Sequence, residues 1–337
     1  MTTYVMGAGA SAHAGFPLAS HLGNELWAWT SSSCGRAGSY DYWTSIDVLH
    51  DLYGDLENIE RILTDFDDAT IGSPAGRLHP SDRKHHLSGF LVALREFLAA
   101  RGAGHAALYE RFVSERVKEG DTFLTFNYDA ELERALKSGG LWEIGDGYGF
   151  PNDLPGIPKS KVHVLKLHGS MNWYGLIMGG HQGAFSPSTM FGSQPVCTRP
   201  CDLKYLGYPP ELKDPGLAAV TQFHAAPAMI LPICSKRFYW KTFFSNVEWE
   251  QFWDDLWKLG EGVLRSSENI IIIGYGMAQV DQRARNLLLN GSNQEAEITL
   301  YCGSRTETIR DEFKARGFKH VEAPPGQKFE NFLGTAP

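Results

Sequence analysis

The sequence predicts an α/β protein with an open, parallel, Rossmann-like sheet, and three observations lead to this fold class. First, several strand-length segments are continuous apolar runs rather than alternating ones, which is typical of parallel strands buried on both faces. Second, segments with helical spacing lie between some of these runs, as in chains that alternate strands and helices. Third, a glycine-rich turn directly follows the first short strand, as in many doubly wound sheets.

Six segments are predicted strands. They cover residues 3–6, 121–126, 161–167, 228–233, 269–274 and 297–302. The helical pattern begins after the first glycine turn, where Leu18, Leu22, Leu26 and Trp27 are spaced as in a helix. Later helices are predicted at 129–137, 247–264 and 281–290. In the helix at 247–264, Trp249, Trp253 and Trp257 share one face, which either core packing or an interface with a partner explains.

Two insertions are predicted within what we expect to be a single domain over residues 1–337. Residues 31–118 form a helical insertion after the first strand–helix unit, because apolar residues recur at helical spacing at 87–98. Residues 176–227 are rich in Gly, Pro and Ser and are predicted to form a loop-rich excursion, with a lid as one possibility.

Composition restricts the classes of partner and the compartment. The net charge of -8 argues against a surface that binds nucleic acid. No apolar run reaches the length of a membrane span, and the N-terminus lacks a signal-peptide pattern, so a cytoplasmic protein is expected. The 5 cysteines are scattered, which favours reduced thiols. Cys197 and Cys201 form a lone C-x3-C pair without the second pair of a structural zinc site, so no metal is expected.

The first candidate site is the turn Gly7-Ala8-Gly9-Ala10-Ser11, together with Gly15, Phe16 and Pro17. Small residues after a first strand allow the backbone to approach a pyrophosphate, and a following helix N-terminus offers free N–H groups to the anion. The segment matches G-x-G but not G-x-G-x-x-G, because position 12 is Ala. The alternative is a tight turn without a ligand.

Asn127 and Asp129 follow the strand at 121–126, and ligands of open α/β sheets lie beyond such carboxyl ends. Alternatively, Asn127 is a turn residue and Asp129 an N-cap of the next helix. His168 ends the strand at 161–167 in the same way and is suited to proton transfer near neutral pH. A histidine packed in the core is the alternative there.

The strand at 269–274 ends in Gly274-Tyr275-Gly276, and Asp281 begins the next helix. The functional interpretation is a second glycine turn that lines a nucleotide. The alternative is an ordinary strand–turn–helix with Asp281 as its cap. Strand ends rich in Gly, Ser and Asn at one sheet edge favour a nucleotide crevice.

Taken together, these motifs resemble the sirtuin superfamily, and specifically its bacterial sirtuin-like NADase branch. Segments 7–11 and 15–17 look like its first NAD-binding segment, and Thr125–Asp129 looks like its Thr-Gln-Asn-Ile-Asp segment, with Phe126 in place of Gln. His168-Gly169 matches its catalytic His-Gly, and the continuation to Trp173 is typical of sirtuin-like defence proteins. Similar later matches are Pro232 to Lys236, Leu256-Trp257 and Ile273–Gly276 with Asp281.

Two departures from the family also matter. Pro17 is followed by Leu18-Ala19-Ser20 rather than Asp-Phe-Arg, and the four zinc-binding cysteines of the protein deacetylases are missing. The resemblance therefore implies an NAD+ hydrolase that releases nicotinamide and ADP-ribose, with NAD+ as substrate rather than cofactor. It implies Asn127 and His168 as catalytic residues, with Asp129 in a supporting role. It also implies the glycine segments as the NAD+ site, with Asp281 as a candidate to bind a ribose hydroxyl.

The resemblance also implies an effector of anti-phage defence that depletes NAD+ on infection. An unregulated NADase is toxic to its host, so we expect a restrained homo-oligomer and a separate activating partner protein. Two other functions stay open. One is a non-catalytic nucleotide-binding sensor or assembly subunit, and the other is a protein deacylase or ADP-ribosyltransferase.

Overall fold

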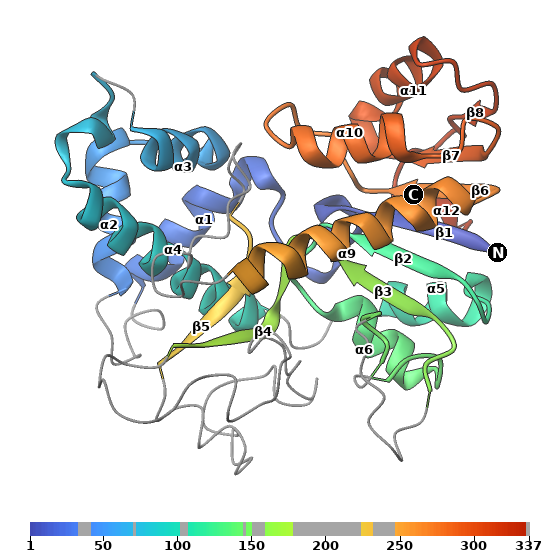
Figure 1. Ribbon diagram of the computed structural model, residues 1–337, viewed down its shortest axis with the longest axis horizontal. Helices are drawn as coiled ribbons and strands as arrows, with labels where there is room; N and C mark the ends of the chain where they lie inside the picture. Colours follow the sequence, from blue (N-terminus) through green and yellow to red (C-terminus); the bar gives the residue numbers. More distant parts are fainter. Residues whose placement is uncertain are drawn as a thin grey trace. The chain divides into compact units, whose positions relative to one another are not determined.

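The computed structural model describes residues 1–32, 42–69, 72–101, 107–143, 146–149, 159–177, 224–231 and 247–334. The chain divides into two compact units (Figure 1). The sheet unit comprises Met1–Leu18, Gly104–His168 and Asp254–Pro337. The helical unit comprises Ala19–Ala103 and Gly169–Trp253. Each unit is assembled from separate stretches of the chain, and the single domain over residues 1–337 with two insertions stays a prediction.

The sheet unit is built on six parallel strands, which confirms the predicted α/β class. The strands are β1 (Thr2–Met6), β2 (Thr122–Thr125), β3 (His163–Lys166), β6 (Asn269–Ile273), β7 (Glu297–Tyr301) and β8 (Val321–Glu322). Their spatial order is β3-β2-β1-β6-β7-β8, which is the order of a doubly wound sheet (Figure 1). The topological switch point lies between β1 and β6, where the chain changes the direction in which it adds strands.

The apolar runs that predicted the strands form the centre of the core. Val5 of β1 lies opposite Leu124 of β2 on one side and Ile272 of β6 on the other, and all three residues are fully buried. Central strands of a parallel sheet have helices on both faces, so they need apolar side chains at consecutive positions.

The sheet unit contains the helices α5 (Ala107–Arg116), α6 (Glu131–Ser138), α10 (Gln282–Gly291), α11 (Thr306–Ala315) and α12 (Phe329–Phe332). Helix α9 (Val247–Ser266) begins in the helical unit and ends in the sheet unit. Helix α5, which lies within the helical insertion predicted at 31–118, belongs to the sheet unit. The Phe112 ring lies 5.1 Å from that of Tyr4, which also stacks on Phe123 at 5.1 Å.

The helical unit contains α1 (Ala19–Ser31), α2 (Tyr42–Tyr53), α3 (Ile59–Asp68) and α4 (Pro80–Arg101). It also holds a two-stranded antiparallel sheet of β4 (Gly169–Ile177) and β5 (His224–Met229). Of the strand predicted at 228–233, residues 228 and 229 belong to β5 of this antiparallel sheet rather than to the parallel sheet, and residues 232 and 233 lie outside the described residues. A short apolar run fits either kind of sheet, and here the partner strand is β4, which the sequence pattern did not reveal.

Some predicted features lie outside the described residues. They are most of the loop-rich excursion at 176–227, the pair Cys197 and Cys201, and the segment from Pro232 to Lys236. In helix α9, Trp253 and Trp257 are buried, as core packing requires. None of the helices within the described ranges is long and apolar enough to cross a membrane.

Candidate functional site

Two glycine turns meet at the switch point of the sheet. The Gly9 N–H donates to the Gly274 carbonyl at 2.9 Å. A Cβ on Gly7 would lie 2.5 Å from the Tyr275 Cα, and one on Gly274 would lie 2.1 Å from the Ala10 nitrogen. Gly274 also has a φ of 64°, which favours glycine. These glycines are therefore required because the two backbones pack directly against each other.

The helix predicted after Gly15-Phe16-Pro17 is confirmed by α1, but the turn between β1 and this helix is longer than a tight strand–helix turn. Two short 3₁₀ helices, Ala8–Ala10 and Ala12–Ala14, follow the strand, and α1 begins only at Ala19 in the helical unit. Several N–H groups of the turn, including those of Gly9, Ala10 and Ser11, donate to backbone carbonyls. The α-helix therefore begins beyond residues 7–17, and nucleotide binding by this segment stays a prediction.

The remaining residues of this segment complete the turn. Gly15 ends the second 3₁₀ helix with a φ of 85°, and the Phe16 N–H donates to the Ser11 carbonyl at 3.4 Å. Phe16 is buried and Pro17 is partly exposed. A side chain at position 276 would have room, since a Cβ on Gly276 would meet only Arg305 Cγ, at 3.9 Å.

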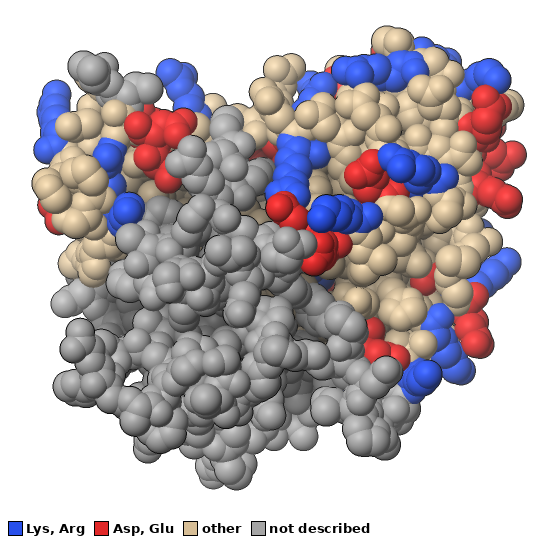
Figure 2. All heavy atoms as spheres, in the orientation of Figure 1, with Lys and Arg blue, Asp and Glu red and all other residues tan. Residues whose placement is uncertain are grey.

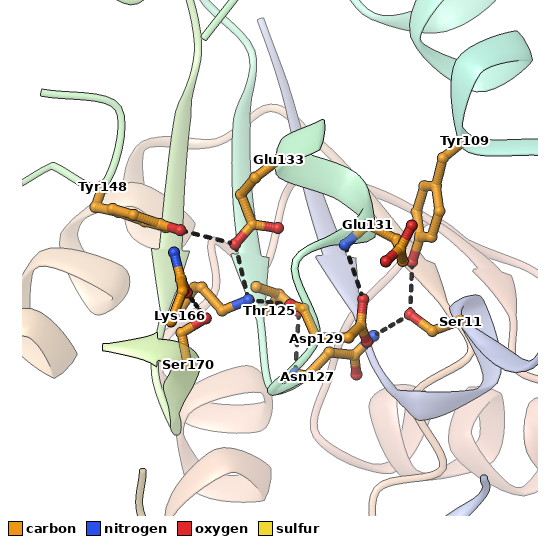
Figure 3. Close-up of polar contacts among 11 residues, drawn as sticks. Ser11, Tyr109, Thr125, Asn127, Asp129, Glu131, Glu133, Tyr148, Lys166 and Ser170 are labelled. Carbon is orange, nitrogen blue, oxygen red and sulfur yellow. Dashed lines mark hydrogen bonds and ion pairs between the residues drawn. The ribbon is translucent and has the colours of Figure 1, made fainter. Parts of the chain in front are cut away.

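Asn127 follows β2 and joins the first glycine turn. Its Nδ2 donates to the Gly7 carbonyl at 3.0 Å. It also donates to Ser11 Oγ at 3.1 Å (Figure 3). Ser11 Oγ in turn lies 2.9 Å from the Tyr109 hydroxyl. All the described hydrogen bonds of the Asn127 side chain use Nδ2, so Oδ1 remains to accept a hydrogen bond from a ligand.

Asp129 is buried two positions further on, in the same loop. Its Oδ1 accepts a hydrogen bond from the Glu131 N–H at 3.2 Å (Figure 3). The N-cap of α6 is Ala130, so the alternative in which Asp129 is the N-cap is wrong by one position. Its side chain nevertheless bonds to the first turn of the helix, as a capping group does.

His168 is buried just beyond β3 and lies close to Asp281. His168 Nε2 is 3.4 Å from Asp281 Oδ2. Asp281 is the N-cap of α10 and accepts from the Ala284 N–H at 3.3 Å, which confirms its predicted capping role. The Tyr275 hydroxyl donates to Asp281 Oδ2 at 3.2 Å. One carboxylate therefore connects the second glycine turn, α10 and the histidine.

Aromatic rings surround this histidine. The centroid of its ring lies 5.1 Å from that of Phe126, 6.0 Å from Trp257 and 6.4 Å from Tyr128. Phe126 also stacks on Tyr275 at 4.4 Å. The structure thus brings the segments after β2, β3 and β6 together at the carboxyl edge of the sheet.

Sequence reasoning missed a buried charged group behind the site. The Lys166 ammonium lies 2.8 Å from Glu133 Oε1, and the two side chains are 0% and 1% exposed. The available signal was a lysine inside an apolar strand, since lysine is almost never fully buried unless it is paired. Tyr148, which also contacts this pair, carried no such signal in the sequence.

Burial controls the titration of several groups near the site. It raises the pKa of Glu131 to about 7 despite the opposing effect of Arg134, and it raises the pKa of Tyr109 well above its usual value. It also raises the pKa of the Cys302 thiol to about 12, so this thiol is unreactive near neutral pH. Within the described part of the chain, no group of three or more His, Cys, Asp or Glu side chains is arranged to hold a metal ion.

The outer surface of α9 and α10 carries charges of both signs. Figure 2 shows acidic and basic side chains interspersed there, and two of the pairs are Arg283–Asp254 at 2.8 Å and Lys258–Asp255 at 3.3 Å. Arg283 also lies over the ring of Trp257, at 4.6 Å from its centroid. A mixed surface of this kind creates no large field of one sign.

The chain is a doubly wound α/β protein with polar and aromatic side chains gathered at the carboxyl edge of its parallel sheet. No protein-family model matches the chain, and no curated protein matches it. Among solved structures, a Sir2 homologue in complex with NAD is similar at 12% identity and a TM-score of 0.40, over 99% of this chain and 88% of the other.

Two further Sir2 structures show the same level of similarity. One is a complex with an inhibitor, 2′-O-acetyl-ADP-ribose and a deacetylated peptide, at 10% identity and a TM-score of 0.37, over 99% of this chain and 91% of the other. The second is described for the mechanism and regulation of Sir2 enzymes and has 13% identity and a TM-score of 0.36, over 98% and 90% of the chains. Similarity at this level defines neither a family nor an activity.

Proposed function

We propose that this chain is an NAD+ hydrolase that converts NAD+ and water into nicotinamide and ADP-ribose. The observation that carries the proposal is the meeting of Asn127, His168 and Asp281 with two glycine turns at one sheet edge. Doubly wound sheets bind dinucleotides at the switch point, outside the carboxyl ends of the strands. The resemblance of segments 7–17, 125–129 and 168–173 to sirtuin-like NADases supports the same substrate.

The chemistry follows from the positions of these side chains. The bond between nicotinamide and the ribose C1′ breaks, and nicotinamide leaves with the electron pair, so the sugar passes through an oxocarbenium-like state. Water adds to C1′ and transfers a proton to His168. The Asp281 carboxylate, 3.4 Å from His168, stabilises the imidazolium that forms. Asn127 Oδ1 accepts a hydrogen bond from the attacking water or a ribose hydroxyl.

One observation favours a second candidate, a nucleotide-binding sensor without catalysis. The Asn127 amide already connects the loop after β2 to Gly7 and Ser11, and this structural role needs no reaction. A sensor would bind NAD+ or a related nucleotide in the same place and leave it intact. The two candidates differ in whether nicotinamide is released.

The test compares the wild type with His168→Ala in bacteria, together with the genes that neighbour it, under phage challenge. NAD+, nicotinamide and ADP-ribose are followed by mass spectrometry. We expect the wild type to consume NAD+ and His168→Ala to lose that activity. His163→Ala is the matched control, because His163 is exposed at the opposite end of β3. Unchanged NAD+ in the wild type, with folded protein and partners present, would favour the sensor instead.

A further inference from the structure

The sheet unit buries a full positive charge behind the candidate site. Lys166 is the last residue of β3, and its side chain is 0% exposed. Removing an ammonium group from water is costly unless it is paired and hydrogen-bonded. Even then, an apolar pair of the same volume is often as stable or more stable. A buried lysine at this place therefore calls for an explanation other than stability alone.

The partners of the ammonium indicate what it does. Lys166 Nζ lies 2.8 Å from Glu133 Oε1 and donates a second hydrogen bond to the backbone carbonyl of Asp129 (Figure 3). The Tyr148 hydroxyl donates to the same Glu133 oxygen at 3.2 Å. Glu133 is the counter-ion, and the contact with Asp129 is to the backbone of a loop.

That loop carries Asn127. Asp129 lies two positions after Asn127, and Lys166 lies two positions before His168. The bond from Lys166 to Asp129 therefore connects the end of β3, next to the histidine, with the loop after β2. Asn127 is anchored at its other side by Gly7 and Ser11, so the loop is held at both ends.

We propose that Lys166 is a positioning residue, which holds the loop of Asn127 and Asp129 in a set place relative to His168, with Glu133 as its counter-ion. A methionine fills the same space but cannot donate to the Asp129 carbonyl, so the loop would lose this anchor. The kinetic consequence rests on the proposed hydrolase function. The positional consequence does not, and it is measured separately.

The kinetic test uses the double variant Lys166→Met/Glu133→Gln, which removes the anchor without leaving an unpaired buried charge. We expect kcat for NAD+ hydrolysis to fall about 100-fold, as for an ångström-scale misplacement, with KM within about threefold of wild type. The control is Thr3→Val. It removes a buried hydrogen bond, Thr3 Oγ1 to Ser267 Oγ at 2.5 Å, near the amino end of β1. This control should lower the unfolding temperature and leave kcat unchanged.

A double variant with kcat within about threefold of wild type would overturn the proposal, because misplacement of this kind costs far more. If the double variant does not fold, the Lys166→Arg variant is tested in its place. Arginine keeps the positive charge and the hydrogen-bond donors but places these donors at a different distance from the backbone. A folded Lys166→Arg protein with lowered kcat and unchanged KM supports a positioning role. Wild-type kcat in Lys166→Arg contradicts it.

A crystal structure of the folded variant separates this proposal from the hydrolase function. If the wild type itself leaves NAD+ intact, the proposed function fails, and the position of Asn127 remains as the readout. We expect the variant to lose the bond from Asn127 Nδ2 to the Gly7 carbonyl, which is 3.0 Å in the wild type. An unchanged bond and loop would overturn the positioning role.

Discussion

For Asp281 and for Asn127, the sequence left a structural role and a functional role as alternatives. Asp281 caps α10 through Oδ1 and approaches His168 through Oδ2. Asn127 connects the loop after β2 to the first glycine turn through Nδ2 and leaves Oδ1 for a ligand. A side chain with two polar atoms can make a structural contact with one and keep the other for the proposed function. The structural and functional interpretations of the sequence are therefore compatible at both positions.

Glu131 carries the pH prediction. Burial raises its pKa from 4.5 to about 7, so the folded protein binds this proton more tightly than the unfolded chain. The contribution of Glu131 to the free energy of unfolding should therefore be largest below pH 4.5 and fall as the pH rises towards 7. The full effect is at most about 3 kcal/mol, at roughly 1.4 kcal/mol per pKa unit.

Glu131→Gln removes this titration while leaving a side-chain oxygen beside Arg134. Urea unfolding of both proteins at pH 4.5 and at pH 7 measures the difference. The variant should lose less stability than the wild type between the two pH values. Equal losses would show that Glu131 titrates in the folded protein as it does in the unfolded chain.

At the scale of elements, the contact between the turn after β1 and the turn after β6 determines the shape of the switch point. Glycine at 7, 9 and 274 is usually interpreted as giving a ligand room, but here the missing Cβ atoms make room for another backbone. The sequence pattern was the same in either case. Only the packing of two segments that are distant in the chain distinguishes these two reasons.

This contact leads to a prediction with a matched control. Gly7→Ala places a Cβ 2.5 Å from the Tyr275 Cα, so one backbone must move. We expect a loss of about 1–3 kcal/mol or more in unfolding free energy, and loss of NAD+ hydrolysis. Gly276→Ala meets nothing closer than 3.9 Å and should stay within about 0.5 kcal/mol of wild type. Chemical denaturation measures both, and equal stability of the two variants would contradict the packing argument.

At the scale of the whole molecule, the chain forms two units, and the candidate site as described lies within the sheet unit. The proposed reaction would harm the host if it ran continuously. We therefore expect the purified chain alone to hydrolyse NAD+ slowly. A partner protein or infection signal should raise the rate by roughly 5–150-fold, the usual range of allosteric coupling.

The measurement compares initial rates of nicotinamide release for the purified chain alone and after mixing with proteins from neighbouring genes. A cell extract from phage-infected bacteria provides the signal arm. The His168→Ala variant, mixed in the same way, measures the background hydrolysis of NAD+ by other enzymes in the extract. A purified chain that already hydrolyses NAD+ at the full rate would contradict restraint, although it would leave the hydrolase proposal intact.

Much of the fold followed from periodicity. The strands β1, β2, β3, β6 and β7 were predicted, because strands covered by helices on both faces are rich in apolar residues. The short edge strand β8 was missed because two residues carry no pattern. The apolar run at 228–233 was predicted as a strand, but its residues 228 and 229 lie in β5 of the antiparallel sheet, because an apolar run indicates that a strand is buried but not which strand pairs with it.

The candidate site divides in the same way. The sequence alone determined which residues follow the ends of the strands, because strand ends are local features. These residues are Asn127, His168 and the two glycine turns. Only the tertiary structure decided that Asp281 reaches His168, that Gly7 faces Tyr275, and that Lys166 holds the Asp129 carbonyl. These contacts join residues far apart in the chain, and they depend on the order in which parallel strands pair, which local residue patterns do not encode.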